Sequence, residues 1–134
     1  SWSQTYRRCI QLADALIKAG LKRGEVVTIM APNIPEMVEA HFGVAMAGGV
    51  LNTMNTRLDT DTIAYILDHA ETRFLLTDAA FSAQMSQALQ KADNKQITII
   101  DIIDRHDAES ASAPLLGDMD YDAFIATGSP DYAR

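Results

Sequence analysis

Apolar residues recur every three or four positions in four stretches of the chain, which is the spacing of one face of an α-helix. These stretches cover residues 3–20, 33–48, 59–70 and the segment that follows Asp78. Short runs of mostly β-branched and apolar residues separate them, at residues 26–30, 50–54, 73–77 and 97–102. Continuous apolar strands of this kind are usually buried on both faces of a parallel sheet. The alternation therefore predicts an α/β fold, a three-layer unit with a mostly parallel sheet flanked by helices.

The residues at the ends of the stretches predict how the helices begin and stop. Ser3 is expected to cap the first helix, and Gly20 to end it in a left-handed turn. Asp14 falls on the polar side of that helix, away from its apolar face. Asn33 and Glu36 have the spacing of a capping box, so we expect them to open the second helix together.

The helical and strand pattern weakens after residue 104, where Ser, Pro and Gly become frequent. We therefore predict two parts, an α/β subdomain over residues 1–104 and a loop-rich linker over residues 105–134. Within the linker, Tyr121, Phe124 and Ile125 have the spacing of one short helix that docks on the body.

Composition and charge indicate a compact globular domain and argue against nucleic-acid-binding and transmembrane proteins. The 134 residues suit one compact domain, and 48% of them are hydrophobic, enough for a real core. A net charge of −7 argues against nucleic-acid binding, which needs clustered Lys and Arg. No apolar run approaches the roughly 20 residues that span a bilayer, so we predict no transmembrane segment. Cys9 is the only cysteine, which excludes an internal disulfide and favours a cytoplasmic setting.

Few residues suggest chemistry of their own. The chain contains neither a G-x-x-x-x-G-K-[ST] phosphate loop nor a G-x-G-x-x-G dinucleotide motif. Gly48-Gly49 is interpreted as a helix stop before a strand, because it lies in the wrong place for a pyrophosphate cradle. The three histidines lack metal-ligand spacing, and His41 is interpreted as a packing or surface residue rather than a base. We predict no catalytic residue and no metal site.

Two further features favour structural interpretations. An acidic cluster follows the fourth strand and is expected to be a solvated loop rather than a site at a strand end; it comprises Asp101, Asp104, Asp107 and Glu109. Cys9 lies on the apolar side of the first helix, which indicates a buried structural cysteine and not a nucleophile.

Arg57 is the one candidate binding residue. It is a lone cation in the turn 52–58, among hydroxyl and amide side chains that leave the end of a strand. Such a cation is suited to holding a phosphate group. The alternative is an arginine that caps a neighbouring carbonyl group or pairs with Asp59 or Asp61. The residues alone leave both interpretations open.

The same turn and its surroundings resemble the N-terminal half of the adenylate-forming enzymes, specifically the acyl-CoA synthetases. The passages that carry the resemblance lie between Trp2 and Asp78, at residues 2–13, 24–27, 31–36, 39–52 and 55–69. The run Asn52-Thr53-Met54-Asn55-Thr56-Arg57-Leu58 is similar to that of medium-chain and aryl carboxylate CoA ligases. The tail over residues 121–132 resembles the linker that precedes the phosphate loop of this family.

The resemblance implies a two-step ligase reaction. A carboxylic acid reacts with ATP, in the presence of Mg²⁺, to give an acyl-adenylate and pyrophosphate, and CoA then displaces AMP. The family's phosphate loop, aromatic-Gly-x-Thr-Glu segment, ribose-binding Asp and C-terminal Lys do not occur in these 134 residues. The chain is therefore expected to be an inactive N-terminal scaffold portion of a fatty-acid or other carboxylate CoA ligase. By the same resemblance, Arg57 is expected to contact the phosphates of CoA.

Two alternatives to the CoA ligase hypothesis stay open. In the first, the chain is a stand-alone flavodoxin-like module that binds a nucleotide or a protein. In the second, it is part of a peptide-synthetase adenylation domain. The absence of an initiating Met and the fading tail favour a piece of a larger protein. Such a piece is expected to self-associate through apolar surface that the missing part would cover.

Overall fold

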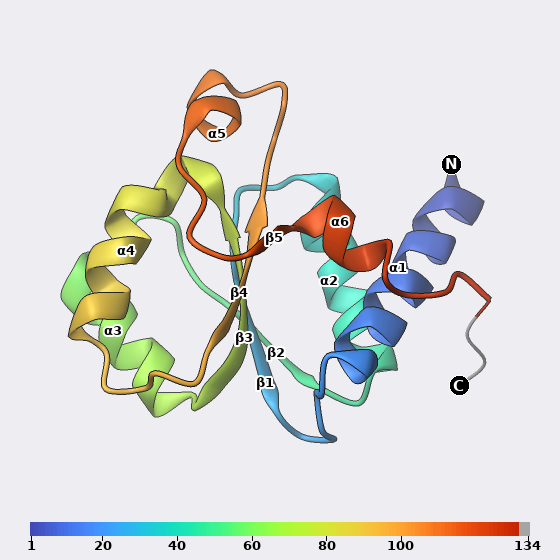
Figure 1. Ribbon diagram of the computed structural model, residues 1–134, viewed down its shortest axis with the longest axis horizontal. Coiled ribbons are helices and arrows are strands. Elements are labelled where there is room, and N and C mark those ends of the chain that lie inside the picture. Colours follow the sequence, from blue (N-terminus) through green and yellow to red (C-terminus); the bar gives the residue numbers. More distant parts are fainter. Residues whose placement is uncertain (132–134) are drawn as a thin grey trace.

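Five parallel strands form the middle layer of the molecule (Figure 1). The computed structural model describes residues 1–131, and its sheet has the order β2-β1-β3-β4-β5. The strands are β1 (Val26–Met30), β2 (Val50–Thr53), β3 (Thr72–Asp78), β4 (Thr98–Ile102) and β5 (Met119–Asp120). Each pairing is parallel, and the first four strands lie where the apolar runs predicted them.

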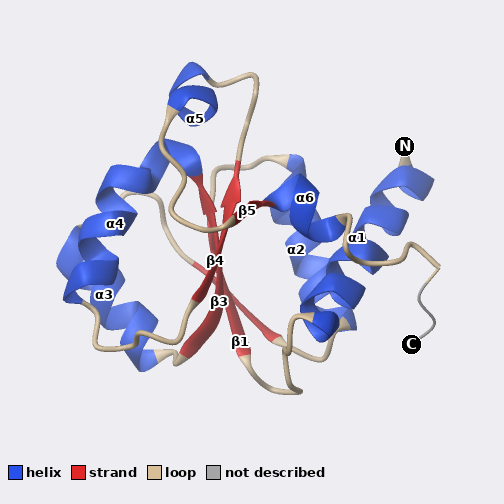
Figure 2. Ribbon diagram, in the orientation of Figure 1, coloured by secondary structure: helices blue, strands red, loops and turns tan. Residues whose placement is uncertain are grey.

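Helices cover both faces of this sheet, as Figure 2 shows. One face carries α1 (Trp2–Lys18), α2 (Pro35–Met46) and α6 (Tyr121–Ile125). The other carries α3 (Thr60–His69) and α4 (Ser82–Lys91), the latter preceded by the 3₁₀ turn η1 (Ala79–Phe81). The arrangement confirms the predicted three-layer α/β unit. No helix among the described residues combines the length and hydrophobicity needed to traverse a lipid bilayer.

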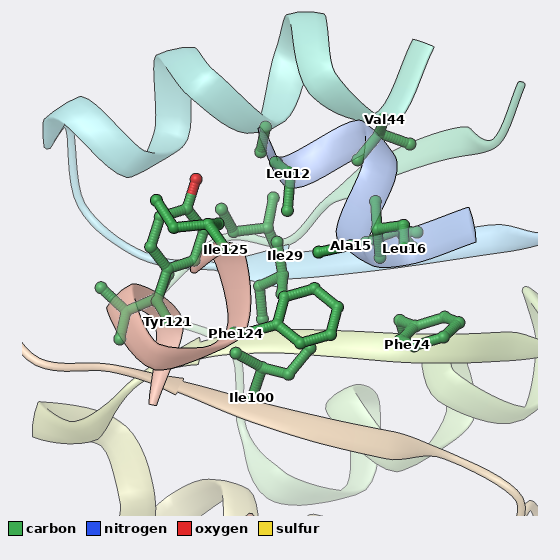
Figure 3. Packing of buried hydrophobic residues seen from close by; sticks show 14 of the residues in the cluster. Leu12, Ala15, Leu16, Ile29, Val44, Phe74, Ile100, Tyr121, Phe124 and Ile125 are labelled. Atoms are coloured by element: carbon green, nitrogen blue, oxygen red, sulfur yellow. The ribbon is translucent and has the colours of Figure 1, made fainter. Parts of the chain in front are cut away.

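Side chains of the central strands alternate between two apolar clusters. On β3, Phe74 and Leu76 face the cluster under α1, α2 and α6, whereas Leu75 joins the cluster under α3 and α4. Figure 3 shows the first cluster, in which α6 side chains lie close to Leu12 and Ile100. Because both faces are covered, consecutive apolar residues occur in the middle of the strands, as at Phe74-Leu75-Leu76 and Ile99-Ile100, rather than a strict apolar–polar alternation.

The helix starts differ from the sequence prediction in two places. Ser1, not Ser3, caps α1, and it forms a capping box with Gln4. The expected capping box of Asn33 and Glu36 is wrong, because α2 begins two residues after Asn33 with Ile34 as its cap and no side-chain cap bond. A proline at the first helical position lacks an N–H and is preorganised for the helix, so this start dispenses with a polar cap.

Two other helix ends agree with the pattern, whereas Asp78, expected to cap the fourth helix, lies one 3₁₀ turn before it. Asp59 caps α3, and its Oδ1 accepts a hydrogen bond from the Thr62 amide at 2.7 Å. Asp78 accepts from the Ala80 amide and so opens η1 rather than α4 itself. Gly48 has a φ of 83°, the left-handed conformation that ends α2 and turns the chain into β2. The interpretation of Gly48 as a helix stop is therefore confirmed.

Residues beyond 104 contain more regular structure than the pattern indicates. A short helix, α5 (Ala108–Ser112), and the two-residue strand β5 were not predicted. β5 pairs with β4 through Ile100–Met119 and Asp101–Asp120. The short helix expected from Tyr121, Phe124 and Ile125 is confirmed as α6, and all three side chains are buried.

Asp101 corrects the interpretation of the acidic cluster as a solvated loop. Its side chain is fully buried in β4, and its two oxygens accept hydrogen bonds from the amides of Leu116 (3.0 Å) and Gly117 (2.7 Å). A Cβ at position 117 would collide with the carbonyl oxygen of Ile99, so the segment crosses directly over the strand. Asp101 therefore anchors the chain that leads into β5, whereas Asp104 accepts from the His106 amide in the loop after β4 and Asp107 caps α5.

We expect Asp101→Asn to lower the free energy of unfolding by about 1–3 kcal/mol, because an amide can accept only one of the two backbone hydrogen bonds and leaves the other N–H buried without a partner. Asp104→Asn is the matched control: its Oδ1 accepts a single bond from the His106 amide, which an asparagine retains. Urea unfolding monitored by circular dichroism measures both variants. Equal stability of the two would contradict the anchoring role.

Candidate functional site

The loops that leave the carboxyl ends of the strands gather at one edge of the sheet. From β1 the chain moves outward to β2, and it then passes back beyond β1 to β3. In open parallel sheets, ligands bind outside the carboxyl ends of the strands where the strand order reverses in this way. The segments that follow β1, β2 and β4 at this edge are residues 31–34, 54–59 and 103–107.

Arg57 lies in the turn that follows β2. The turn is fixed by local contacts: Met54 is buried, Asn55 Oδ1 accepts from the Arg57 amide at 2.8 Å, and Gln84 Nε2 donates to the carbonyl oxygen of Leu58. The Arg57 side chain is exposed. Its guanidinium forms no hydrogen bond or ion pair with any residue of the described range 1–131.

The two carboxylates that could pair with Arg57 are engaged elsewhere. Asp59 caps α3, and the Thr62 N–H holds the pKa of its carboxyl below the ordinary value. Asp61 Oδ1 lies 2.7 Å from Lys91 Nζ on α4. The alternative role of Arg57, in which it pairs with one of these carboxylates, is therefore not observed, and its charge is available to an anion.

A surface hollow of about 360 Å³ lies at the same edge, between the loops after β1 and β4. It is lined by ionisable side chains of acidic and basic type, namely Glu36, Asp104, Arg105, His106 and Asp122. Burial, and secondarily the Glu39 carboxylate, raise the pKa of the half-buried Glu36. Arg105 and His106 are exposed, so the hollow is open to solvent and does not enclose a ligand by itself.

A second hollow, of about 470 Å³, lies near the amino ends of the strands, and polar side chains that line it bond to the backbone of the protein. Asp68 lines it and accepts from the amides of Asp93 (3.0 Å) and Asn94 (2.8 Å), which lowers the pKa of its carboxyl. Asn94 also donates to the carbonyl oxygen of Thr72 at 2.9 Å. These polar groups hold the loop after α4 in place, at the edge opposite Arg57.

His41, His69 and Cys9 each have a local structural environment. His41 is exposed, with Nδ1 2.8 Å from the carbonyl oxygen of Met37, and His69 stacks on Tyr65. Cys9 is buried, and burial raises the pKa of its thiol, which disfavours the reactive thiolate form. No group of three or more His, Cys, Asp or Glu side chains in the described part of the chain could hold a metal ion.

The burial of two carboxylates was not predicted from the sequence. Asp14, expected on the polar side of its helix, is only 3% exposed, and Glu39 on α2 is equally buried. Both accept hydrogen bonds from residues beyond 120, namely Ser129 and Tyr121. No local signal marks these two contacts, because Tyr121 is 82 positions from Glu39 and Ser129 is 115 positions from Asp14.

Comparison with known proteins identifies relatives along nearly the whole chain. The family described as AMP-binding enzyme matches residues 1–123. The chain is 41% identical to a peroxisomal butyrate–CoA ligase and 38% identical to a peroxisomal benzoate–CoA ligase, both of Arabidopsis thaliana. It is 36% identical to a peroxisomal trans-cinnamate:CoA ligase of Petunia hybrida. These matches cover 97–99% of the chain but only 23–25% of each relative, so the chain spans about a quarter of their length.

Solved structures of similar fold show the same arrangement of elements. The anthranilate CoA ligase AuaEII, in complex with anthranoyl-AMP, superimposes with a TM-score of 0.82 at 21% identity, over 96% of this chain and 23% of the other. A benzoate CoA ligase from Burkholderia xenovorans gives 0.77 at 23% identity, over 97% and 24%. At these identities the likeness establishes the fold. Together with the family match over residues 1–123, it shows that the chain belongs to the AMP-binding enzyme family.

Proposed function

We propose that the chain is the N-terminal scaffold portion of an ATP-dependent carboxylate CoA ligase. The parent would form an acyl-adenylate from a fatty acid or other carboxylic acid and ATP, and would then transfer the acyl group to CoA. The observation that carries this proposal is the family match over residues 1–123, combined with the three relatives above, which are named as CoA ligases. These names favour the ligase over a peptide-synthetase adenylation domain or a stand-alone binding module.

The described residues support a scaffold role rather than a catalytic one. Buried carboxylates accept hydrogen bonds from backbone amides of later segments, and the cysteine is buried in the core. We infer that the groups that bind ATP and Mg²⁺ belong to other parts of the parent. Residues 1–104 would then form the supporting subdomain, and residues 105–134 would lead toward the ATP-binding part.

Arg57 is proposed as a contact for the phosphates of CoA. Its guanidinium is exposed at the carboxyl edge of the sheet and unpaired within the described range. A guanidinium presents N–H donors in a fork that matches phosphate oxygens, so it can bind CoA without taking part in the reaction. This placement predicts a role in the second half-reaction and not in adenylation.

We also propose that the parent is located in the cytoplasm, as the single cysteine suggests. The three relatives described above are all named as peroxisomal, so the peroxisome is the competing location for the parent. Fluorescence imaging of the tagged parent in its own cell distinguishes diffuse from punctate distribution.

The isolated chain is expected to catalyse no ATP–pyrophosphate exchange with butyrate, benzoate or cinnamate, because it lacks the groups that would stabilise the charge of the transferring phosphate. The full-length parent, assayed in parallel, serves as the positive control. Exchange by the chain above a buffer blank would contradict the scaffold assignment, and no exchange by the parent would contradict the ligase assignment.

Arg57→Ala in the parent is expected to raise KM for CoA on the order of tenfold to a hundredfold, because one charged hydrogen-bonding contact to phosphate is lost. The rate of ATP–pyrophosphate exchange should change by less than about twofold. Arg7→Ala is the matched control, since Arg7 is also exposed and lies on α1, away from this turn. An equal loss in both half-reactions would instead indicate that Arg57 has a structural role.

We also propose that the isolated chain self-associates through apolar side chains on α1 and α2. Trp2 is 76% and Phe42 50% exposed, and each has a second exposed apolar residue four positions away, Tyr6 and Val38. Residues four apart lie on the same side of a helix, and α1 and α2 pack against each other. Such a surface tends to drive association of a free domain.

Light scattering coupled to size exclusion is expected to show a mass that rises with concentration for the unmodified chain and approaches the monomer for the double variant Trp2→Ser/Phe42→Ser. Tyr65→Ser is the control, because Tyr65 is 63% exposed but lies on α3, on the other face of the sheet. A concentration-independent monomer of the unmodified chain would contradict the proposal.

A further inference from the structure

After α6 the chain crosses α1 on the way to its last described residues (Figure 1). At the crossing, Thr127 and Ser129 contact Lys18 and Asp14 of α1. Two carboxylates on the underlying helices, Asp14 of α1 and Glu39 of α2, are each 3% exposed. A buried carboxylate is stable only where hydrogen bonds or opposite charges satisfy it. In both cases residues 121–131 supply part of that satisfaction.

The first attachment is made by Glu39. Its Oε1 accepts from the hydroxyl group of Tyr121 at 2.8 Å, and its Oε2 accepts from Arg8 Nε at 2.8 Å. Arg8 also donates to Asp122 Oδ1 at 3.1 Å, and its guanidinium lies 5.8 Å from the centre of the Tyr121 ring. Both oxygens of the buried carboxylate are thus occupied, and one bond comes from each of α1 and α6.

The second attachment is made by Asp14. Its Oδ2 accepts from the Ser129 amide at 2.7 Å and lies 2.9 Å from Lys18 Nζ. Lys18 in turn donates to the carbonyl oxygen of Thr127 at 3.3 Å. Gly128 lies so close to α1 that a Cβ there would collide with the Gln11 carbonyl oxygen. The segment therefore contacts the backbone of α1 as well as its side chains.

Apolar contacts join the two attachments. Tyr121, Phe124 and Ile125 are at most 6% exposed and belong to the same cluster as Leu12 and Ile100 (Figure 3). Phe124 also lies beside Phe74 of β3, with ring centres 6.5 Å apart. If residues 121–131 detached from the body, these three side chains would become exposed to solvent, and so would the residues of α1 that they cover.

We propose that residues 121–131 form a strap that opens and closes as one unit and that Glu39 and Asp14 latch at its two ends. Regions that unfold separately from the rest of a protein are held by a contiguous set of contacts, and this segment has such a set. The inference does not depend on the ligase assignment. In a chain that continues beyond the strap, closure fixes the point from which the following residues leave the body.

Residue-resolved hydrogen exchange by NMR tests the strap directly. Asp14→Ala removes the second latch and is expected to speed exchange at strap amides, from residue 124 through 129, by on the order of tenfold or more. Amides of β3, α3 and α4 should keep their rates. Asp68→Ala is the matched control, because Asp68 also holds two distant backbone amides but on the other face of the sheet; it should speed exchange near Asp93 and Asn94 only.

Tyr121→Phe tests whether the two latches act on one unit, and it preserves the ring in the core in case Asp14→Ala does not fold. It is expected to speed exchange at the Ser129 amide, eight positions away, by the same factor as at the α6 amides. Faster exchange confined to residues 121–125 would overturn the single strap. Faster exchange throughout β3 and α3, or unchanged strap rates in both variants, would overturn the proposal as well.

Discussion

Burial of the central strands on both faces is the constraint on which this structure depends. Side chains of β1 and β3 alternate between two apolar clusters, so neither face can meet water without exposing a row of apolar groups. Helices must therefore cover both sides, and the connections must pass over the ends of the strands. Loops can vary in conformation only at the ends of the strands. Arg57 and the open hollow beside Glu36 both lie in loops at the carboxyl ends.

Periodicity allowed most of this architecture to be predicted because it reflects local physical requirements. A strand buried on both faces needs several consecutive apolar residues, and a helix that packs on a sheet needs an apolar face. The first four strands and their helices could therefore be predicted from the sequence. Helix starts were less predictable. Asn33 has the chemistry of a cap, but Pro35 sets the first turn and moves the start past it. A strand as short as β5 has no period at all, and only its pairing with Ile100 and Asp101 defines it.

Charged residues were misjudged where their partners are far away in the sequence. Asp14, Glu39 and Asp101 look like ordinary surface carboxylates, yet each is buried and accepts hydrogen bonds from a later segment. A local pattern contains no information about a partner 82 or 115 positions away. Arg57 differs from these carboxylates, because its amide bonds to the nearby Asn55 and its side chain has no hydrogen-bond or ion-pair partner among residues 1–131.

The way charge is used within the fold explains how a chain with a net charge of −7 can be suited to phosphate-bearing ligands. Buried carboxylates are neutralised by backbone N–H groups or by Arg8 and Lys18, so their charge supports the fold and is not displayed as an acidic site. What remains at the carboxyl edge includes an exposed guanidinium on a turn held rigid from below. Phosphoryl and adenylyl transfer depend chiefly on positioning and charge stabilisation, so under the proposed function the chain would act as a support that presents cations and would need no catalytic group of its own.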